Sequence, residues 1–324
     1  VFAAYSGGLK TNRDAWMYNY DADKLQGNVE RMIDFYNGQV EAFKEHCKST
    51  GIINPGLKDV ESFIAYDSTR ISWNTADKSR MKKEEKYTFQ ADSIATGTYR
   101  PFNKQLVYFN GKLNERTYQL PPMFPSPEER NFGFYVTGMG SDRPFATCMV
   151  DQIPDLAFWG SSSGQFFSRY TYLKSENEGP QPSLGLDIGP EGRVDNITDA
   201  ALADYRKTYG AEITKDDIFY YVYGLLHSPE YRSQFAADLK KSLPRIPKVE
   251  GFQSFAGAGR TLAPPRGGRV PRSPRAGGPA GPGRASRPPA RRRGAGGSVA
   301  GRGGRARLLP GVGRCPLDHG HAPR

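Results

Sequence analysis

The segment that most constrains the fold is residues 213–247, which carries the densest set of helix signals in the chain. Thr214 can cap a helix, and Asp217 lies three residues later, near the positive end of the helix dipole. Ser228 to Glu230 is a second helix start, with Pro at its first helical position, and Pro244 ends the pattern. Between these signals, apolar and aromatic residues recur on helical faces at Ile218, Tyr221, Val222, Leu225, Leu226, Tyr231, Phe235, Leu239 and Leu243. We predict a helical hairpin with an aromatic seam, which is a core element rather than an active site.

The other periodic segments predict an α+β fold. A 3.6-residue apolar stripe indicates a long helix near the start of the chain, formed by Leu25, Val29, Met32, Ile33, Tyr36, Val40 and Phe43. Residues 78–86 are rich in both charges and predict a charged helix. Residues 87–175 are typical of short strands, with Asn110-Gly111 as a hairpin signal. The predicted order is a helical entry segment, a central mixed or antiparallel β region and the C-terminal helical hairpin, which is an α+β domain.

The last 64 residues differ in composition from the rest of the chain. Residues 261–324 contain 14 Arg, no Lys and a single acid, Asp318, which gives a net charge of +13 and leaves residues 1–260 nearly neutral. A segment of Gly, Pro, Ala and Arg cannot bury enough apolar surface to offset its ordering entropy, so we expect a disordered, low-complexity tail. The tail is either a basic arm that binds phosphate or a frameshift product. We favour the frameshift, because these residues are those of GC-rich codons.

The body of the chain contains no recognisable catalytic motif. It has no G-x-x-x-x-G-K-[ST] loop and no dinucleotide fingerprint, and Pro121-Pro122 lacks the flanking residues of an amine methyltransferase. Residues 160–164 match G-x-S-x-G, but the following residues predict a strand instead of the helix that a nucleophile elbow needs. The cysteines fit neither a disulfide framework nor a zinc site. We predict no catalytic, cofactor or metal site. Without an apolar run of about 18 residues or a signal peptide, we also predict a soluble cytoplasmic chain with no membrane partner.

Two polar clusters are candidates for contact with DNA. Arg and Asn side chains are best shaped for bidentate contacts to guanine and adenine edges, and basic residues of the charged helix could follow a phosphate backbone. The candidate DNA-binding residues are Asn12, Arg13, Arg100, Arg80, Lys82 and Lys83. Each cluster also has a structural interpretation, which composition alone favours. Residues 10–14 could be a loop held by an Arg13–Asp14 contact, Arg100 could form a structural ion pair, and residues 78–86 could be a solvated helix face.

Several motifs, in this order along the body, are similar to those of one protein family. The longest and most specific is residues 213–247. The shorter ones are Lys10 to Trp16, Tyr99 to Phe102, Val136 to Gly138, Ile153 to Leu156 and Gln165 to Tyr170. On these residues the chain resembles, over nearly all of residues 1–260, the C-terminal specificity (target-recognition) domain of type ISP restriction–modification enzymes. In that family, one polypeptide joins a nuclease, an ATP-driven motor, an adenine-N6 methyltransferase and this terminal domain.

The resemblance implies that residues 1–260 form a target-recognition domain, a fragment of a longer polypeptide, which agrees with a first residue, Val1, that is not Met. It implies sequence-specific recognition of double-stranded DNA, with the methyltransferase and helicase domains of the parent as partners. It also implies that the fragment has no catalytic activity or cofactor of its own. The parent, a site-specific adenine DNA methyltransferase and restriction endonuclease, would use S-adenosylmethionine and ATP with Mg²⁺. Two alternatives stay open: the domain could complete the methyltransferase active site, or dock the motor without reading DNA.

Overall fold

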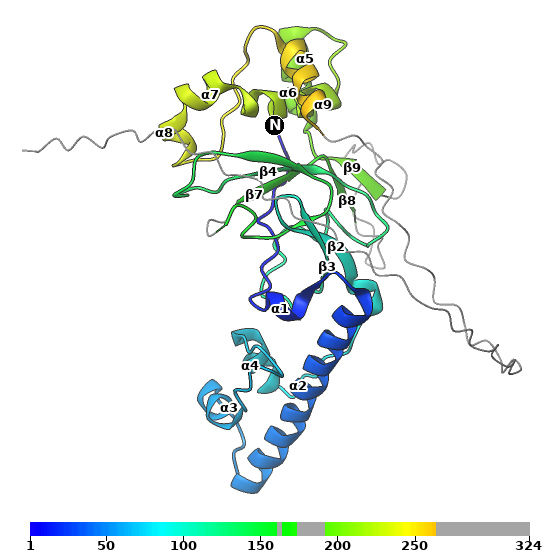
Figure 1. The fold of residues 1–324 in the computed structure, drawn as a ribbon, viewed down its shortest axis with the longest axis vertical. Coiled ribbons are helices and arrows are strands. Elements are labelled where there is room, and N and C mark those ends of the chain that lie inside the picture. The colour runs from blue at the N-terminus through cyan, green and yellow to red at the C-terminus, as the bar shows by residue number, and fades with distance from the viewer. Residues whose placement is uncertain (161–163, 174–191, 264–324) are drawn as a thin grey trace, which may run out of the picture. The chain divides into compact units, whose positions relative to one another are not determined.

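The computed structural model describes residues 1–160, 164–173 and 192–263, all within one compact unit that spans residues 1–268. Along the chain, helices are followed by short strands and then by helices again (Figure 1), which confirms the α+β prediction. Of the predicted tail, residues 261–324, the first two residues belong to a helix (Phe252–Leu262), and residues 264–324 lie outside the described residues, as do the three serines of the G-x-S-x-G match. None of the described helices combines the length and the apolar character needed to cross a membrane.

The N-terminal helices are built around α2 (Ala22–Thr50), which follows α1 (Asp14–Met17) and β1 (Tyr18–Asn19). The Asp21 side chain caps α2 by accepting a hydrogen bond from the Lys24 amide (2.9 Å). Gly51 ends the helix in the left-handed conformation, with a φ of 71°. Every residue of the predicted stripe is buried, namely Leu25, Val29, Met32, Ile33, Tyr36, Val40 and Phe43. The helix prediction is therefore confirmed.

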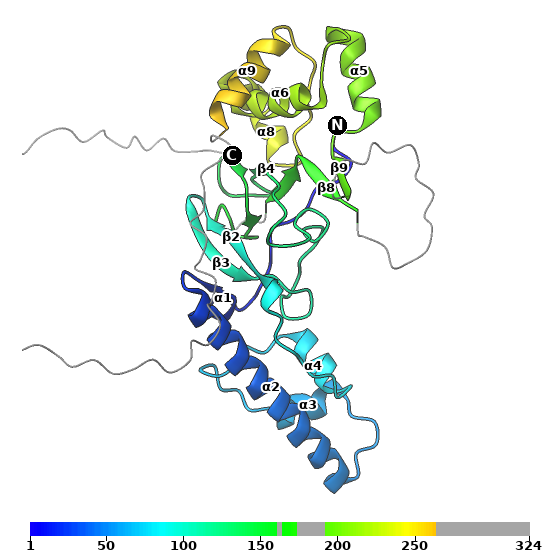
Figure 2. The ribbon, with the colours of Figure 1, turned by 90° about the vertical axis from the view of Figure 1, so that its right-hand side faces the viewer.

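Two short helices, α3 (Leu57–Phe63) and α4 (Thr75–Met81), lie alongside α2, as both Figure 1 and Figure 2 show. They contribute Val60 and Met81 to the same hydrophobic cluster as the α2 stripe. The predicted charged helix is α4, but it ends at Met81, so only the first part of residues 78–86 is helical.

The first sheet has the strand order β1-β3-β2-β6. Its strands beyond β1 are β2 (Ile94–Arg100), β3 (Asn103–Tyr108) and β6 (Ile153–Pro154), with the 3-10 turn η1 (Ala91–Ser93) before β2. β2 and β3 form an antiparallel hairpin with Thr96 opposite Leu106, and β6 runs parallel to β2. The hairpin turn is at Pro101-Phe102, whereas Asn110-Gly111 starts a turn after β3. The Asn110-Gly111 signal therefore marks a turn, but the turn between β2 and β3 lies at Pro101-Phe102.

The second sheet has the order β5-β4-β7 and the third pairs β8 with β9. The strands are β4 (Gly133–Val136), β5 (Thr147–Val150), β7 (Gln165–Ser168), β8 (Tyr170–Tyr172) and β9 (Arg193–Asp195). Arg169, between β7 and β8, is buried and forms ion pairs with Asp195 and with Asp216 at the start of the C-terminal helices. This arginine therefore ties both sheets to those helices.

The C-terminal helices are α5 (Asp199–Tyr209), α6 (Lys215–His227), α7 (Pro229–Gln234), α8 (Ala236–Leu239) and α9 (Phe252–Leu262). α6 begins as predicted: the Thr214 hydroxyl accepts from the Asp217 amide (3.1 Å) and the Asp217 carboxylate accepts from the Thr214 amide (2.8 Å). Ser228 caps α7, with Pro229 at its first position. All of α6 from Ile218 to Leu226 is buried, so this helix is the centre of the C-terminal part.

The helix packed most closely on α6 is α9, and not the segment that follows α6 directly. Gly224 of α6 and Gly259 of α9 make this crossing possible. A Cβ atom at Gly224 would lie 2.1 Å from the Phe255 carbonyl oxygen, and one at Gly259 would lie 2.0 Å from the Tyr220 carbonyl oxygen. The second arm of the predicted hairpin is divided between the short helices α7 and α8. The aromatic seam is thus completed from further along the chain, where Phe252 stacks on Tyr221 at 4.7 Å.

Residues 2–10 connect two hydrophobic clusters of the described chain. One cluster contains the N-terminal helices and the first sheet, and the other contains the C-terminal helices and one face of β4. Phe2 packs on the Phe134 ring of the second cluster at 5.5 Å, and its backbone pairs with Ile197. Leu9 belongs to the first cluster, where its backbone pairs with Asp155. This segment therefore contributes to both cores and leads directly into the predicted DNA-binding loop.

Candidate nucleic-acid interface

The loop of residues 11–14 is held in a fixed turn that exposes Asn12. The Thr11 hydroxyl donates to the Asp14 carboxylate and accepts from the Arg13 amide (3.1 Å). Asn12 adopts a left-handed conformation with a φ of 55°, which asparagine tolerates better than most residues. Its side chain is exposed and makes no hydrogen bond to any described residue. Asn12 is therefore placed, as the prediction requires, where its amide is available to a ligand.

Arg13, predicted as its neighbour in DNA contact, is instead buried. Its Nη2 forms an ion pair with Asp77 of α4 (2.5 Å), and its side chain is 1% exposed. The Asp77 carboxylate also accepts from the Tyr87 hydroxyl (2.8 Å) and the Asn74 amide (3.0 Å). The Arg13–Asp14 contact considered from the sequence is not formed. In this conformation Arg13 joins α1 to α4, so we do not include it in the candidate interface.

Arg100, at the end of β2, is fixed and still accessible. Its Nη1 donates to the Asp155 carboxylate and to the Tyr99 carbonyl oxygen (2.6 Å). Its guanidinium carbon lies 4.1 Å from the centre of the Tyr99 ring, a cation–π distance. The side chain is nevertheless 34% exposed. Nη2 and Nε donate to no described residue, so one edge of the planar group remains available for a bidentate contact.

Asp155 holds Arg100 from a buried position. Burial raises the pKa of this carboxyl to about 6; the Arg100 guanidinium opposes that rise and the Asp14 carboxylate adds to it. The Ala157 amide donates to the same carboxylate (2.9 Å). A Cβ atom at Gly8 would lie 2.3 Å from the Asp155 carbonyl oxygen, so only glycine lets the N-terminal segment pass this close. Asp155 thus orients Arg100 from the interior.

The loop of residues 11–14 and the end of β2 are joined through Asp14. The Tyr99 hydroxyl donates to the Asp14 carboxylate (3.0 Å), whose other oxygen accepts from Thr11. Arg100 stacks on the ring of the same Tyr99. One tyrosine therefore contacts both the loop that presents Asn12 and the side chain of Arg100. These two predicted residues therefore belong to one site, which we call the Asn12–Arg100 site.

The other predicted basic residues surround the end of α4. Arg80 pairs with Glu85 at 3.3 Å, in agreement with the structural interpretation of the charge run. Lys82 and Lys83 are exposed and have no carboxylate partner among the described residues. Glu84 beside them pairs with Lys44 of α2 (2.6 Å). Two lysines of the six predicted residues are therefore free to contact phosphate.

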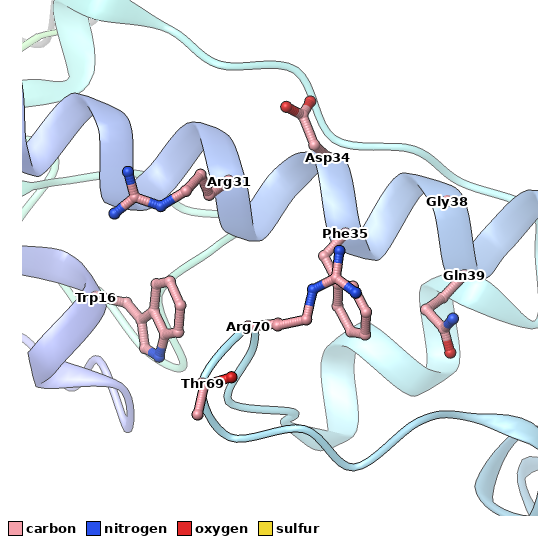
Figure 3. A pocket seen from close by; sticks show the side chains of 8 residues that line it. All are labelled: Trp16, Arg31, Asp34, Phe35, Gly38, Gln39, Thr69 and Arg70. Atoms are coloured by element: carbon pink, nitrogen blue, oxygen red, sulfur yellow. The ribbon is translucent and has the colours of Figure 1, made fainter.

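An open groove between α1, α2 and the loop after α3 was not predicted from the sequence. Its volume is about 530 Å³. Figure 3 shows its lining residues, which are Trp16, Arg31, Asp34, Phe35, Gly38, Gln39, Thr69 and Arg70. The Arg70 guanidinium covers the Phe35 ring at 4.4 Å, and Arg31 donates to Asn28 (2.5 Å). Neither arginine has a carboxylate partner among the described residues, so the groove offers two cations and Trp16 close to the loop that presents Asn12.

The turn of the β2–β3 hairpin carries a second unpredicted feature, the exposed ring of Phe102. Its side chain is 95% exposed. Tyr20, 72% exposed, reaches the same turn, where its hydroxyl donates to the Asn103 side chain (3.0 Å). Pro101-Phe102 between two strand patterns is the signal that could have located the turn. Exposure of the ring, however, depends on the fold and could not be read from the sequence.

The described residues contain no group of three or more His, Cys, Asp or Glu side chains suited to hold a metal ion. His227, one of the two histidines in these residues, packs edge-on against Tyr223 at 4.7 Å, and burial lowers the pKa of its imidazole. The other, His46, lies against the Phe63 ring at 5.0 Å. Both contacts are structural, and neither histidine is part of the Asn12–Arg100 site.

Comparison with known proteins assigns the chain to a family. Residues 1–264 match the family described as the Type ISP C-terminal specificity domain. A nuclease-deletion mutant of the Type ISP restriction-modification enzyme LlaGI, in complex with a DNA substrate mimic, is similar, with a TM-score of 0.68 and 31% identity over 81% of this chain. DrdV in a DNA complex is similar too, with a TM-score of 0.67 and 30% identity over 81% of this chain.

The ATP-dependent Type ISP restriction-modification enzyme LlaBIII bound to DNA has a TM-score of 0.65 and 26% identity, again over 81% of this chain. The match spans only 22% of LlaGI, 23% of DrdV and 15% of LlaBIII. A search of curated proteins gives no match. The family predicted from the sequence motifs is thus confirmed: the chain belongs to the Type ISP C-terminal specificity domains.

Proposed function

We propose that this domain reads a DNA target through the Asn12–Arg100 site, on behalf of a longer type ISP enzyme. The observation that carries the proposal is the state of Arg100, which is oriented by a buried carboxylate and a tyrosine ring, while its side chain stays 34% exposed and its Nη2 and Nε donate to no described residue. A side chain fixed in advance loses little conformational entropy on binding, so more of its contact energy is available for discrimination.

The chemistry of the two exposed groups fits base edges in the major groove. The open edge of a guanidinium is shaped for O6 and N7 of guanine, and an amide for N6 and N7 of adenine. Each such bidentate contact discriminates against the wrong base by about 1–3 kcal/mol. Arg100 would read a guanine and Asn12 an adenine, with the shared Tyr99 support fixing the spacing between them.

Phosphate contacts would come from neighbouring cations. Lys82 and Lys83 are exposed and unpaired with any described carboxylate, and Arg31 and Arg70 line the groove beside α1. Phosphate contacts position a protein on the duplex without reading sequence. The near-neutral charge of residues 1–260 is compatible with this function, because a few local cations suffice when other domains of the parent also hold the duplex.

Two of the similar solved structures are complexes with DNA and one is a complex with a DNA substrate mimic, and one of the enzymes is described as ATP-dependent. We propose that the parent of this domain likewise uses ATP with Mg²⁺ in its motor and S-adenosylmethionine in its methyltransferase. Those two domains would be the protein partners of residues 1–260, and the domain by itself would be without catalytic activity.

The test is selection of duplexes from a random library by the full chain. Affinities for the enriched duplex and for a scrambled duplex are then measured by gel shift across a salt series. We expect a preference of at least about 10-fold, corresponding to one bidentate contact. Arg100→Lys should lose discrimination at one base pair, because a lysine cannot make the planar bidentate contact. Lys207→Ala, an exposed charge removed from α5, is the matched control.

Equal affinity for every duplex would overturn the proposal. Methyl transfer to DNA by the chain alone, with S-adenosylmethionine present, would support the alternative that the domain completes a methyltransferase site. Stable association with the isolated motor domain, without any preference among duplexes, would support the docking alternative. The three outcomes are distinct.

A further inference from the structure

Phe102 combines two unfavourable properties at one position. Its ring is 95% exposed at the turn of the β2–β3 hairpin. Its backbone is in the left-handed region with a φ of 65°, where glycine or asparagine is strongly preferred over a bulky residue. An aromatic residue in such a place stabilises nothing within the domain. Bulky residues held in such strained backbone conformations cluster at functional positions.

Comparison with the other left-handed residues shows that Phe102 is different. Besides Asn12, the bulky residues with positive φ in the described part of the chain are Glu84 and Tyr118. The ion pair with Lys44 (2.6 Å) offsets the backbone strain at Glu84. The Tyr118 ring packs on Gly7, where an added Cβ atom would lie 3.2 Å from the ring, and this packing offsets the strain at Tyr118. Phe102 has no ring, cation or hydrophobic partner among the described residues. No described residue therefore offsets the strain at Phe102, and we look for its partner outside the chain.

The surroundings of the ring indicate what kind of partner it meets. Arg100 precedes the turn, and Lys104 follows it and forms a half-exposed ion pair with Asp151 (2.8 Å). Asn103 and Tyr20 hydrogen-bond across the same turn (3.0 Å). The exposed aromatic surface at this turn is thus limited to the rings of Phe102 and Tyr20, in a polar and cationic setting. A protein-docking surface would present a broader apolar core instead.

We propose that Phe102 is a wedge that enters a base-pair step of double-stranded DNA next to the site read by Arg100. Apolar side chains inserted in this way unstack a step and kink the duplex. This proposal rests on the proposed function only for the presence of DNA, because insertion of a ring does not itself require sequence recognition. A wedge would also help the parent enzyme, since extraction of a base for methylation requires local unstacking.

The hairpin holds the Phe102 ring in a rigid position. The ring of Pro101 fixes the φ angle of that residue, directly before Phe102, and the paired strands β2 and β3 hold the turn on both sides. The Tyr20 hydroxyl restrains Asn103 directly after it. A ring held in this way loses little entropy on insertion, whereas a ring on a long loop would first have to be ordered.

The experiment compares the full chain with its Phe102→Ala variant on two duplexes of one sequence, one fully paired and one with a single mismatched step. A mismatched step is already partly unstacked, so a wedge binds it more tightly. We expect the wild type to prefer the mismatched duplex by about 10-fold and Phe102→Ala to bind both equally. Ile53→Ala removes an 89% exposed side chain from the loop after α2 and should behave as wild type.

A fluorescent base analogue, 2-aminopurine, placed along the paired duplex gives the second readout. Its fluorescence should rise at one step with the wild type and with Phe102→Trp, and stay unchanged with Phe102→Ala. Phe102→Asn should raise Tm, because asparagine suits the left-handed backbone, and still lose the signal. A lower Tm for Phe102→Asn would contradict the strain argument.

The wedge is overturned if Phe102→Ala keeps both the mismatch preference and the fluorescence change, or if the wild type has neither. A protein contact would then be the better explanation of the exposed ring. Failure of the proposed function gives a different pattern, since a chain that selects no sequence would still show the mismatch preference. A chain that binds neither duplex would overturn both proposals.

Discussion

Arg13 and Arg100 are two residues of one type, both proposed for DNA contact, that lie in different surroundings in the fold. Arg13 meets Asp77, 64 positions away, in a fully buried pair, whereas Arg100 meets Asp155, 55 positions away, with a third of its side chain exposed. Neither partner is visible in the local sequence. Long-range packing therefore decides which of the two arginines is buried and which keeps an exposed guanidinium.

We expect Arg13→Met to lower the free energy of unfolding by about 3–5 kcal/mol, because it leaves the buried Asp77 carboxylate without its cation. Urea unfolding monitored by circular dichroism measures this. The double variant Arg13→Met/Asp77→Asn should recover part of the loss. At a temperature where Arg13→Met remains folded, its preference among duplexes should equal that of the wild type. A lost preference with unchanged stability would instead identify Arg13 as a reader of bases.

Asp155 gives a prediction for pH dependence. Its pKa is raised by burial from an ordinary value of about 4 to about 6. Between these values the folded chain binds the proton and the unfolded chain does not. The contribution of Asp155 to stability is therefore greatest below about pH 4, declines as the pH rises, and is lost above about pH 6.

Relative to Asp155→Asn, which cannot titrate, the wild type should lose on the order of 2 kcal/mol of unfolding free energy between about pH 4.5 and about pH 7. Urea unfolding of both proteins at the two pH values measures the difference. Asp151→Asn, which removes a half-exposed carboxylate of the same region, should show no comparable change. A wild-type-to-variant difference that stays constant with pH would contradict the raised pKa.

At the scale of elements, local signals predicted what local interactions determine. The α2 stripe, the Thr214 cap of α6 and the Ser228-Pro229 start of α7 all depend on residues within one or two turns, and all are confirmed. The closest partner of α6 was not predicted, because the crossing with α9 depends on two glycines 35 positions apart. The position of the hairpin turn likewise depended on strand register rather than on the strongest turn dipeptide.

The candidate site divides in the same way. Asn12 and Arg100 were proposed from side-chain chemistry, and their exposure agrees with that role, while their contact with DNA stays a prediction. The Asp155 and Tyr99 supports, the groove and the Phe102 ring were missed as parts of the site. Each of these features depends on contacts between residues that are distant in the sequence, or on the absence of such contacts. The fold determines these contacts, and the local sequence pattern does not show them.

The α6–α9 crossing can be tested with a matched set of glycine variants. Gly224→Ala and Gly259→Ala should each destabilise the chain by about 2–4 kcal/mol, because the new methyl group would overlap a backbone carbonyl and force the helices apart. Gly257→Ala, on α9 but with no atom within 4 Å of its Cβ position, should stabilise by about 0.5–1 kcal/mol through helix propensity. Thermal unfolding separates the variants. Similar Tm values for all three would contradict the close crossing.

For the whole chain, the excess positive charge lies in the last 64 residues of the sequence. Residues 261–324 carry +13, and the part before them is nearly neutral. We expect a chain ending at residue 263 to keep its urea unfolding transition and its preference among duplexes. Its total affinity should depend much less on salt, because fewer counterions are released when the 14 arginines of the tail are absent.

The measurement is the slope of log affinity against log salt for the two lengths of chain. Equal slopes would show that the tail does not contact DNA, and a lower urea midpoint for the shorter chain would place part of the tail within the folded domain. Sequencing the gene beyond codon 260 tests the frameshift interpretation separately, because a confirmed reading frame would restore the basic arm.

The N-terminal segment has a consequence for the order in which the chain folds. The Ala3 and Ala4 amides both donate to Asn196, and the Ala4 contact spans 192 positions of sequence. Residues 3 and 4 can therefore pair with Asn196 only after nearly the whole domain has been synthesised. Contacts of such long sequence separation slow folding, because the loop they close is entropically unfavourable. Residues 2–10 are thus among the last parts of the domain to form, and the loop of residues 11–14 that follows them is completed only when the domain is nearly finished.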